Sequence, residues 1–143
     1  MIVNTILSGK GSDVVTIEPT ATLAEASQLL ALHRIGAVVV TGAGERIVGI
    51  VSERDIVRAL AKNGAAALGL PLTDVMTRKV VTCSRADTIA ELMERMTGGK
   101  FRHLPVVEDD RLVGIISIGD VVKMRLQEME HEQNALRDYI QTA

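Results

Sequence analysis

The sequence predicts an α+β fold of two tandem β-α-β-β-α repeats, packed with pseudo-two-fold symmetry and followed by a long C-terminal helix. One motif occurs twice, 65 residues apart: an apolar strand runs through Ser-x-x-Asp into a helix at 48–55 and again at 113–120. The flanking residues also match, because 14–16 and 80–82 both read Val-Val-Thr. One unit of this size cannot bury its own apolar face, so we expect the copies to pack together and to form sites in pairs.

The first copy shows the element order clearly. Thr22 and Glu25 predict a capping box at the start of a helix that ends near Gly36. β-branched runs on either side of Gly42-Ala43-Gly44 predict a hairpin. The predicted elements are a strand over 14–17, the helix from 22, hairpin strands over 37–41 and 47–52, and a helix over 53–62.

The second copy repeats this order and then extends it. We predict a strand over 80–83, a helix over 88–97 closed by Gly98-Gly99, hairpin strands over 104–107 and 112–117, and a last helix longer than its counterpart. In that helix an apolar seam is interrupted only by Gln133. The seam residues are Val122, Leu126, Met129, Leu136 and Ile140.

The predicted boundaries follow from the two copies. They are an N-terminal segment over 1–13, a first repeat over 14–64, a linker over 65–79, a second repeat over 80–124 and a helical extension over 125–143. The start of the linker, 65–71, is weakly apolar and uncharged, so we expect it to lie against the body.

Composition excludes several function classes. A net charge of −2 gives no general attraction to a phosphate backbone, and Phe101 and Tyr139 alone provide no stacking platform, so we expect no nucleic-acid partner. The single cysteine, Cys83, permits no intramolecular disulfide and indicates a reducing, cytoplasmic location. No signal peptide or membrane span is apparent, so we expect a soluble protein without a membrane partner.

Two β-α-β-β-α units, each ending in Gly-h-h-Ser-x-x-Asp (h, apolar), resemble a CBS domain pair, or Bateman module, of the stand-alone type. The run 103–107, His-Leu-Pro-Val-Val, lies where that family carries its HLPVV-type strand. The resemblance implies a regulatory, non-catalytic module that binds an adenosine-containing ligand in clefts between the repeats. AMP is the first expectation, with ATP, NAD or S-adenosylmethionine as alternatives. It also implies a homodimer, with an effector protein as a further partner.

The duplicated turn has two interpretations. Asp55 and Asp120 can accept hydrogen bonds from both hydroxyls of a ribose, while Ser52, Ser117 and the adjoining helix N-termini hold a phosphate. Alternatively, Ser-x-x-Asp only caps each helix. The helices that begin after Thr22 and Thr88 use Thr-x-x-Glu instead, and aspartate is the poorer reach-back partner, which favours ligand binding.

The second cleft is the stronger prediction for a phosphorylated ligand, because Lys100, Arg102 and His103 lead into its strand. In the first turn, Arg54 and Arg58 either neutralise a phosphate or pair with a surface acid. Lys10-Gly11 resembles a segment of stand-alone family members, but a solvated loop lysine is the simpler interpretation.

By the same resemblance, Thr16-Ile17 and Thr82-Cys83 line the adenine pocket. The alternative is that they are ordinary strand ends and that Cys83 is a small buried hydrophobe. The predicted set is completed by the motif residues Leu104, Pro105, Ile118 and Gly119.

Other chemistries find no support in the sequence. The three histidines, His33, His103 and His131, lie on separate elements without ligand spacing, so no metal is expected. No nucleophile with a base, acid pair or phosphate loop predicts catalysis. The hypothesis from a different class is a structural homodimerisation scaffold with no physiological nucleotide.

Overall fold

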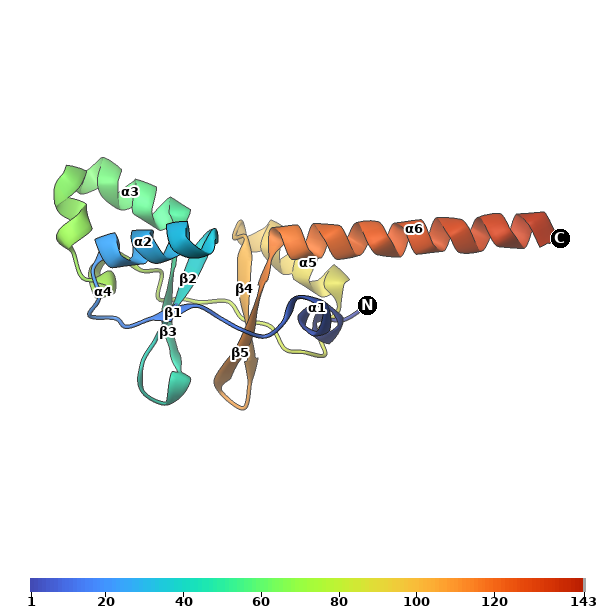
Figure 1. The fold of residues 1–143 in the computed structure, drawn as a ribbon, viewed down its shortest axis with the longest axis horizontal. Coiled ribbons are helices and arrows are strands. Elements are labelled where there is room, and N and C mark those ends of the chain that lie inside the picture. Colours follow the sequence, from blue (N-terminus) through green and yellow to red (C-terminus); the bar gives the residue numbers. More distant parts are fainter. Residues whose placement is uncertain (143) are drawn as a thin grey trace.

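The computed structural model describes residues 1–142, and it places the two repeats side by side with the last helix projecting from the second (Figure 1). The first repeat folds around a sheet in the order β1-β2-β3, with β1 parallel to β2 and β2 antiparallel to β3. Its elements are β1 (Thr16–Ile17), α2 (Leu23–His33), β2 (Ala37–Thr41), η1 (Ala43–Glu45), β3 (Ile47–Ser52) and α3 (Glu53–Asn63). The predicted order is confirmed, although β1 is shorter than expected.

The second repeat contains α5 (Ile89–Gly99), the antiparallel hairpin β4 (His103–Glu108) and β5 (Arg111–Ser117), and α6 (Ile118–Thr142). The strand predicted over 80–83 is wrong, because only Cys83 bridges to β4. Its N–H donates to the Pro105 carbonyl, and its own carbonyl accepts from the Val107 N–H, both at 2.9 Å. Residues 80–82 belong to no strand, and the Val80 N–H donates instead to Arg78 O at 3.1 Å.

The ends of α2 and α5 show the same duplication. Both helices end at a residue in the left-handed conformation, Arg34 (φ 54°) and Lys100 (φ 57°). The prediction that Gly98-Gly99 closes α5 is therefore wrong by one residue. Gly99 lies inside the helix, where a Cβ would overlap the ring of Phe101.

Within the described residues, each repeat has its own hydrophobic cluster. The first gathers Leu23, Val38 and Val51 together with Leu72 and Met76. The last two come from the linker, which folds as η2 (Gly64–Gly69) and α4 (Leu72–Val75). Within 65–71, Ala67 is fully buried in the same cluster, so this stretch lies against the body, as predicted.

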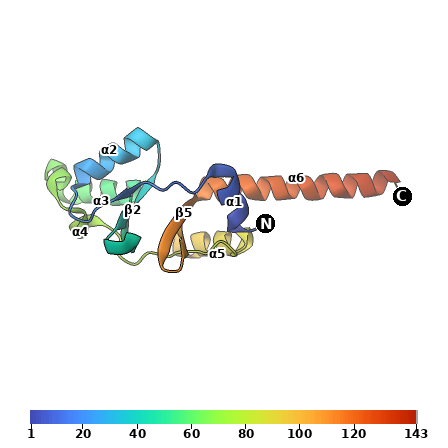
Figure 2. The ribbon, with the colours of Figure 1, turned by 60° about the horizontal axis from the view of Figure 1, so that its bottom comes forward.

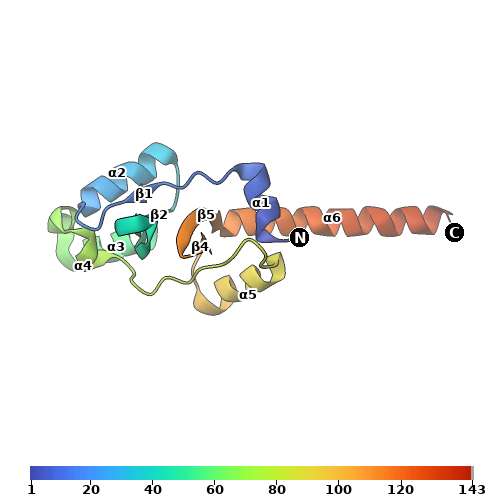
Figure 3. The ribbon, with the colours of Figure 1, turned by 90° about the horizontal axis from the view of Figure 1, so that it is seen from below.

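The second cluster is completed by the N-terminal segment, for which no structure was predicted. Residues Val3–Lys10 form helix α1, and Val3, Ile6 and Leu7 are buried against Leu92. Seen from below, α1 lies beside β5 and the start of α6 (Figure 3). The Val3 N–H donates to Asp87 O at 2.9 Å, which joins α1 to the loop before α5.

Gly49 in β3 and Gly114 in β5 occupy equivalent positions in the two repeats, and each contacts a segment outside its hairpin: the linker in the first repeat and α1 in the second. A Cβ on Gly49 would lie 2.5 Å from the Met76 sulfur, and one on Gly114 would lie 2.7 Å from Leu7 Cδ2. Each glycine therefore admits an apolar side chain from outside its own hairpin. In the turned view, α1 packs over the second repeat while α4 lies at the far end of the first (Figure 2).

Helix α6 leaves the body after its first turns and continues to Thr142, the last described residue. Val121 is buried, whereas every described residue from Met129 onward is exposed. No helix within residues 1–142 is long and apolar enough to cross a membrane.

Candidate functional site

A pocket of about 210 Å³ opens between the two repeats. One buried water needs roughly 10–15 Å³ by the same measure, so the space suits a small organic ligand. The first repeat provides the end of β3 and the start of α3, the linker provides 77 and 79, and the second repeat provides 80–81 and the loop from α5 to β4. The lining residues are Gly36, Ile50, Ser52, Glu53, Arg54, Asp55, Arg58, Thr77, Lys79, Val80, Val81, Lys100, Phe101, Arg102 and His103.

Asp55 lies at the buried side of this pocket, with only 6% of its surface exposed. Its Oδ2 accepts hydrogen bonds from the Ser52 N–H at 2.9 Å and the Ser52 hydroxyl at 3.1 Å. Its Oδ1 accepts from the Thr77 hydroxyl at 3.1 Å, with Arg58 Nη1 at 3.5 Å. A carboxylate offers about four acceptor sites, so a sugar hydroxyl would replace Thr77 or share Oδ1 with it.

In both copies Ser-x-x-Asp caps the helix that follows it. Ser52 and Asp55 form a capping box, and Ser117 N–H and hydroxyl donate to Asp120 Oδ2 at 2.9 and 3.0 Å. The Asp55 carboxylate accepts a hydrogen bond from the Ser52 N–H at 2.9 Å, just as the longer Glu25 side chain does from the Thr22 N–H at 3.1 Å. Capping does not remove these side chains from the pocket, so it does not by itself exclude a ligand.

The helix N-termini are less available to a phosphate than expected. The first N–H of α3, on Glu53, donates to Gly36 O at 3.0 Å, and that of α6, on Ile118, donates to Arg102 O at 2.8 Å. These hydrogen bonds hold the start of each helix to the residue just before the first strand of its hairpin. An anion would therefore rely on side-chain cations.

Such cations are concentrated in the pocket. Among the described residues that line it, five side chains are cationic and two are acidic, a formal charge of +3 with histidine neutral. The whole chain carries −2. The cationic residues are Arg54, Arg58, Lys79, Lys100 and Arg102. A concentrated positive field in a narrow cleft attracts anionic ligands.

Two contacts across the repeat boundary shape the pocket. Arg54 Nη1 donates to the Lys100 carbonyl at 2.9 Å, which ties α3 to the left-handed end of α5. The His103 ring lies against Gly36, where a Cβ would be 3.1 Å from Cε1. Burial lowers the pKa of His103 below its usual 6.5, opposed in part by Glu53.

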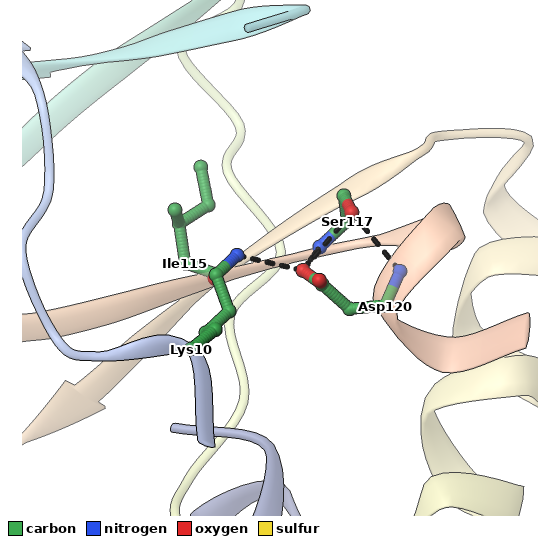
Figure 4. Close-up of polar contacts among 4 residues, drawn as sticks. All are labelled: Lys10, Ile115, Ser117 and Asp120. Carbon is green, nitrogen blue, oxygen red and sulfur yellow. Dashed lines mark hydrogen bonds and ion pairs between the residues drawn. The ribbon is translucent and has the colours of Figure 1, made fainter. Parts of the chain in front are cut away.

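Asp120, the pseudo-symmetric counterpart of Asp55, is held differently (Figure 4). Lys10 Nζ donates to Asp120 Oδ2 at 2.7 Å and to the Ile115 carbonyl at 3.0 Å. Burial raises the pKa of Asp120, but the hydrogen bonds from Lys10 and Ser117 outweigh it and hold that pKa below its usual value. The interpretation of Lys10 as a solvated loop lysine is therefore wrong, because α1 delivers it to this carboxylate.

Comparison with known proteins decides the family. The CBS domain family model matches residues 11–62 and 72–126, one match for each repeat. The chain belongs to the CBS domain family. A CBS-domain containing protein from Agrobacterium tumefaciens has the same fold with a TM-score of 0.85 and 52% identity, over 87% of this chain and 99% of that one.

Other CBS relatives are more distant. A mitochondrial CBS domain-containing protein of Arabidopsis thaliana is 34% identical over 124 residues, which is 84% of this chain and 60% of that protein's length. A CBS domain protein from Pyrobaculum aerophilum, solved in complex with AMP, has a TM-score of 0.75 and 32% identity, over 84% of this chain and 89% of that one. The CBS domain pair of protein MJ0100, solved with 5′-methylthioadenosine and S-adenosyl-L-methionine, has a TM-score of 0.80 and 26% identity, over 90% of this chain and 98% of that one.

The CBS pair brings together only part of the predicted ligand set. Ser52, Arg54, Asp55, Lys100, Arg102 and His103 line one pocket. The last three were expected at the Asp120 cleft, and the structure places them in the lining of the Asp55 pocket, because Arg54 at the start of α3 binds the Lys100 carbonyl in the loop from α5 to β4. Ser117, Ile118, Gly119 and Asp120 form the second turn, outside this pocket.

Several predicted ligand residues contribute to the CBS cores instead. Ile17, Cys83 and Leu104 are buried, and Leu104 is fully enclosed. Burial raises the pKa of the Cys83 thiol to about 12, so the buried-hydrophobe interpretation is correct. Pro105 provides the carbonyl that pairs with Cys83, and Thr16 lies in β1. Thr82 borders a separate shallow depression with Arg46 and Asp110.

Sequence reasoning missed the contribution of the CBS linker. Thr77 and Lys79 line the pocket because Thr77 pairs with Ile50 on the free edge of β3, at 2.9 Å in both directions. Phe101 was considered only as an aromatic count. Its position between Lys100 and Arg102, both predicted ligand residues, was the signal available. No cluster of three or more metal-binding side chains occurs in residues 1–142.

Proposed function

We propose that this CBS pair is a regulatory ligand-sensing module that binds an adenine nucleotide of the AMP, ATP or NAD type in the Asp55 pocket. The observation that carries the proposal is the +3 formal charge of that pocket in a chain of net charge −2. A phosphorylated ligand matches this field, whereas an uncharged nucleoside would leave it unused.

The pocket divides into regions suited to the parts of a nucleotide. Lys100 and Arg102 would hold phosphate, since arginine offers paired donors to its oxygens. Asp55 would accept the ribose hydroxyls at Oδ1 in place of Thr77. Ile50, Val81 and Phe101 provide apolar surface for a purine, and Val81 is 40% exposed and open to contact.

Relatives support the ligand class. The Pyrobaculum aerophilum protein carries AMP, and the MJ0100 pair carries 5′-methylthioadenosine and S-adenosyl-L-methionine. All three ligands contain adenosine, but only AMP has a phosphate. The cationic lining of the Asp55 pocket is the reason to favour AMP, ATP or NAD here.

We propose that occupancy regulates another protein, in the manner of an energy sensor, and that the module catalyses no reaction. The unpaired Cys83 agrees with a reducing compartment such as the cytoplasm. The alternative is a structural homodimerisation scaffold. The satisfied capping boxes favour it, because both turns are stable without any ligand.

The test is isothermal calorimetry of the full chain with AMP, ATP, NAD and S-adenosylmethionine, using Asp55→Asn and Asp120→Asn as a matched pair. Both variants keep an oxygen for the serine N–H. We expect Asp55→Asn to weaken binding about 10- to 150-fold, because charged hydrogen bonds contribute about 1.5–3 kcal/mol. Asp120→Asn should change affinity less than about threefold, below 0.7 kcal/mol.

Two results would reject the proposal. One is that none of the four ligands binds or raises the melting temperature, since a ligand at 100 times its Kd should stabilise the fold by about 2.7 kcal/mol. The other is an equal loss of affinity in both variants, which would show that Asp55 acts only as a cap.

A further inference from the structure

The exposed part of α6 has an apolar face that its own body does not cover. Residues at the heptad positions a (Leu126, Gln133, Ile140) and d (Val122, Met129, Leu136) form one stripe along the helix. The exposed fraction of the five apolar members lies between 45% and 64%. The body instead covers the opposite face, through Val121 and Met124.

The projecting segment also lacks support as a single helix. From Met129 to Thr142 every residue is exposed, and a lone helix of about 12–15 residues is marginally stable in water. The whole of α6 spans about 37 Å. The second family match ends at residue 126, so this extension lies beyond the match to the CBS repeat.

Charges flanking the stripe indicate what covers it. The g positions carry Arg125, Glu132 and the uncharged Tyr139, and the e positions carry Lys123, Glu130 and Arg137. In a parallel in-register pair, g meets the e′ position five residues later, so Arg125 faces Glu130′ and Glu132 faces Arg137′ (the prime marks the second copy). Both contacts are between opposite charges.

An antiparallel pair is disfavoured by the same residues. Centred on the stripe, it would bring Glu130 and Glu132 each against the same residue of the other copy. It would also place the Gln133 amide against Met129′. In the parallel arrangement Gln133 meets Gln133′, so each amide finds a hydrogen-bonding partner.

We propose that residues 122–140 of α6 form a parallel, in-register two-stranded coiled coil with a second copy of this chain. Both CBS pairs then lie at the same end of the coil, related by a two-fold axis along it. The proposal does not depend on whether the Asp55 pocket binds a nucleotide.

Orientation is tested by disulfide formation in the full chain under mild oxidation. Leu136→Cys lies at a d position and faces its own copy only in a parallel pair, whereas Asn134→Cys lies on the outer face and serves as the control. We expect Leu136→Cys to cross-link at least about tenfold faster than the control. Cys83 is buried and stays reduced in both.

Pairing is tested by exchanging charges. Arg137→Glu and Glu132→Arg each place like charges across the parallel interface, while a mixture of the two variants restores opposite charges. Sedimentation equilibrium should show each variant alone dimerising about tenfold more weakly than the mixture. Equal rates for Leu136→Cys and Asn134→Cys would overturn the proposal. The proposal would also be overturned if Leu126→Cys cross-linked to Leu136→Cys faster than Leu136→Cys does to itself, which would indicate an antiparallel pair. It would equally be overturned if mixing the two charge variants did not strengthen dimerisation.

Discussion

Replacing Lys10 with methionine should destabilise the protein by about 1 kcal/mol at pH 7. Lys10 Nζ lies 2.7 Å from Asp120 Oδ2, and the two side chains are 35% and 22% exposed. A charge-assisted hydrogen bond contributes about 1.5–3 kcal/mol. We reduce this to about 1 kcal/mol because Lys10 is more than a third exposed and Ser117 continues to hold the carboxylate. The melting temperature should fall by roughly 3–4 °C.

The pH dependence of this loss follows from the lowered pKa of Asp120. Its pKa in the folded state lies below the usual 3.8, so the pair stabilises the protein fully above pH 3.8. The stabilisation is lost as the pH falls through the folded-state pKa, because the carboxylate is then protonated in both states. The difference between wild type and Lys10→Met should therefore be largest at neutral pH and should shrink in acid.

Urea denaturation at low salt, from pH 7 downward, measures the effect. Lys62→Met is the control, since Lys62 is an exposed lysine near the end of α3. The reasoning is refuted if Lys10→Met and Lys62→Met are equally stable at pH 7. It is also refuted if the difference stays constant as the pH falls well below 3.8.

Three further predictions test the cores and the pocket. Burial holds the pKa of His103 below 6.5, so wild type should lose stability as pH falls below 6.5 while His103→Gln does not; parallel curves would contradict this. Leu7→Ala should cost about 2–5 kcal/mol in chemical denaturation, because α1 completes the second core; a cost under 1 kcal/mol would contradict that placement. Gly49→Ala should cost about 1–3 kcal/mol, because its Cβ meets Met76; thermal melts unchanged from wild type would argue against that contact.

Local patterns predicted the elements well where one segment carried the whole signal. Thr22 and Glu25 form the predicted capping box, and β2 and β3 begin and end at the predicted residues. The prediction failed at Val80, because a strand needs a neighbouring strand to pair with. The Val80 N–H instead bonds to the nearby Arg78 carbonyl. Helix α1 was overlooked although Val3, Ile6 and Leu7 have helical spacing, because eight residues carry too few turns to stand out.

For the candidate site, the sequence also predicted local features but not contacts between distant segments. The residue types were identified: Ser52, Asp55, Arg102 and His103 all line the pocket. Which of these residues share a pocket was not identified. His103 and Asp120 belong to the same repeat, so the sequence suggested that they serve the same cleft. In space, His103 faces the first repeat.

The sequence by itself determined the duplication, the capped helices and the chemistry present at each turn, because these depend on residues a few positions apart. Only the tertiary structure decided which carboxylate faces a pocket. Arg54 reaches a carbonyl 46 residues away, and Lys10 reaches Asp120 across 110 residues. Two turns that share the Ser-x-x-Asp motif therefore differ in the surroundings of the aspartate, since distant segments bring the Lys10 amine to Asp120 and the Thr77 hydroxyl to Asp55.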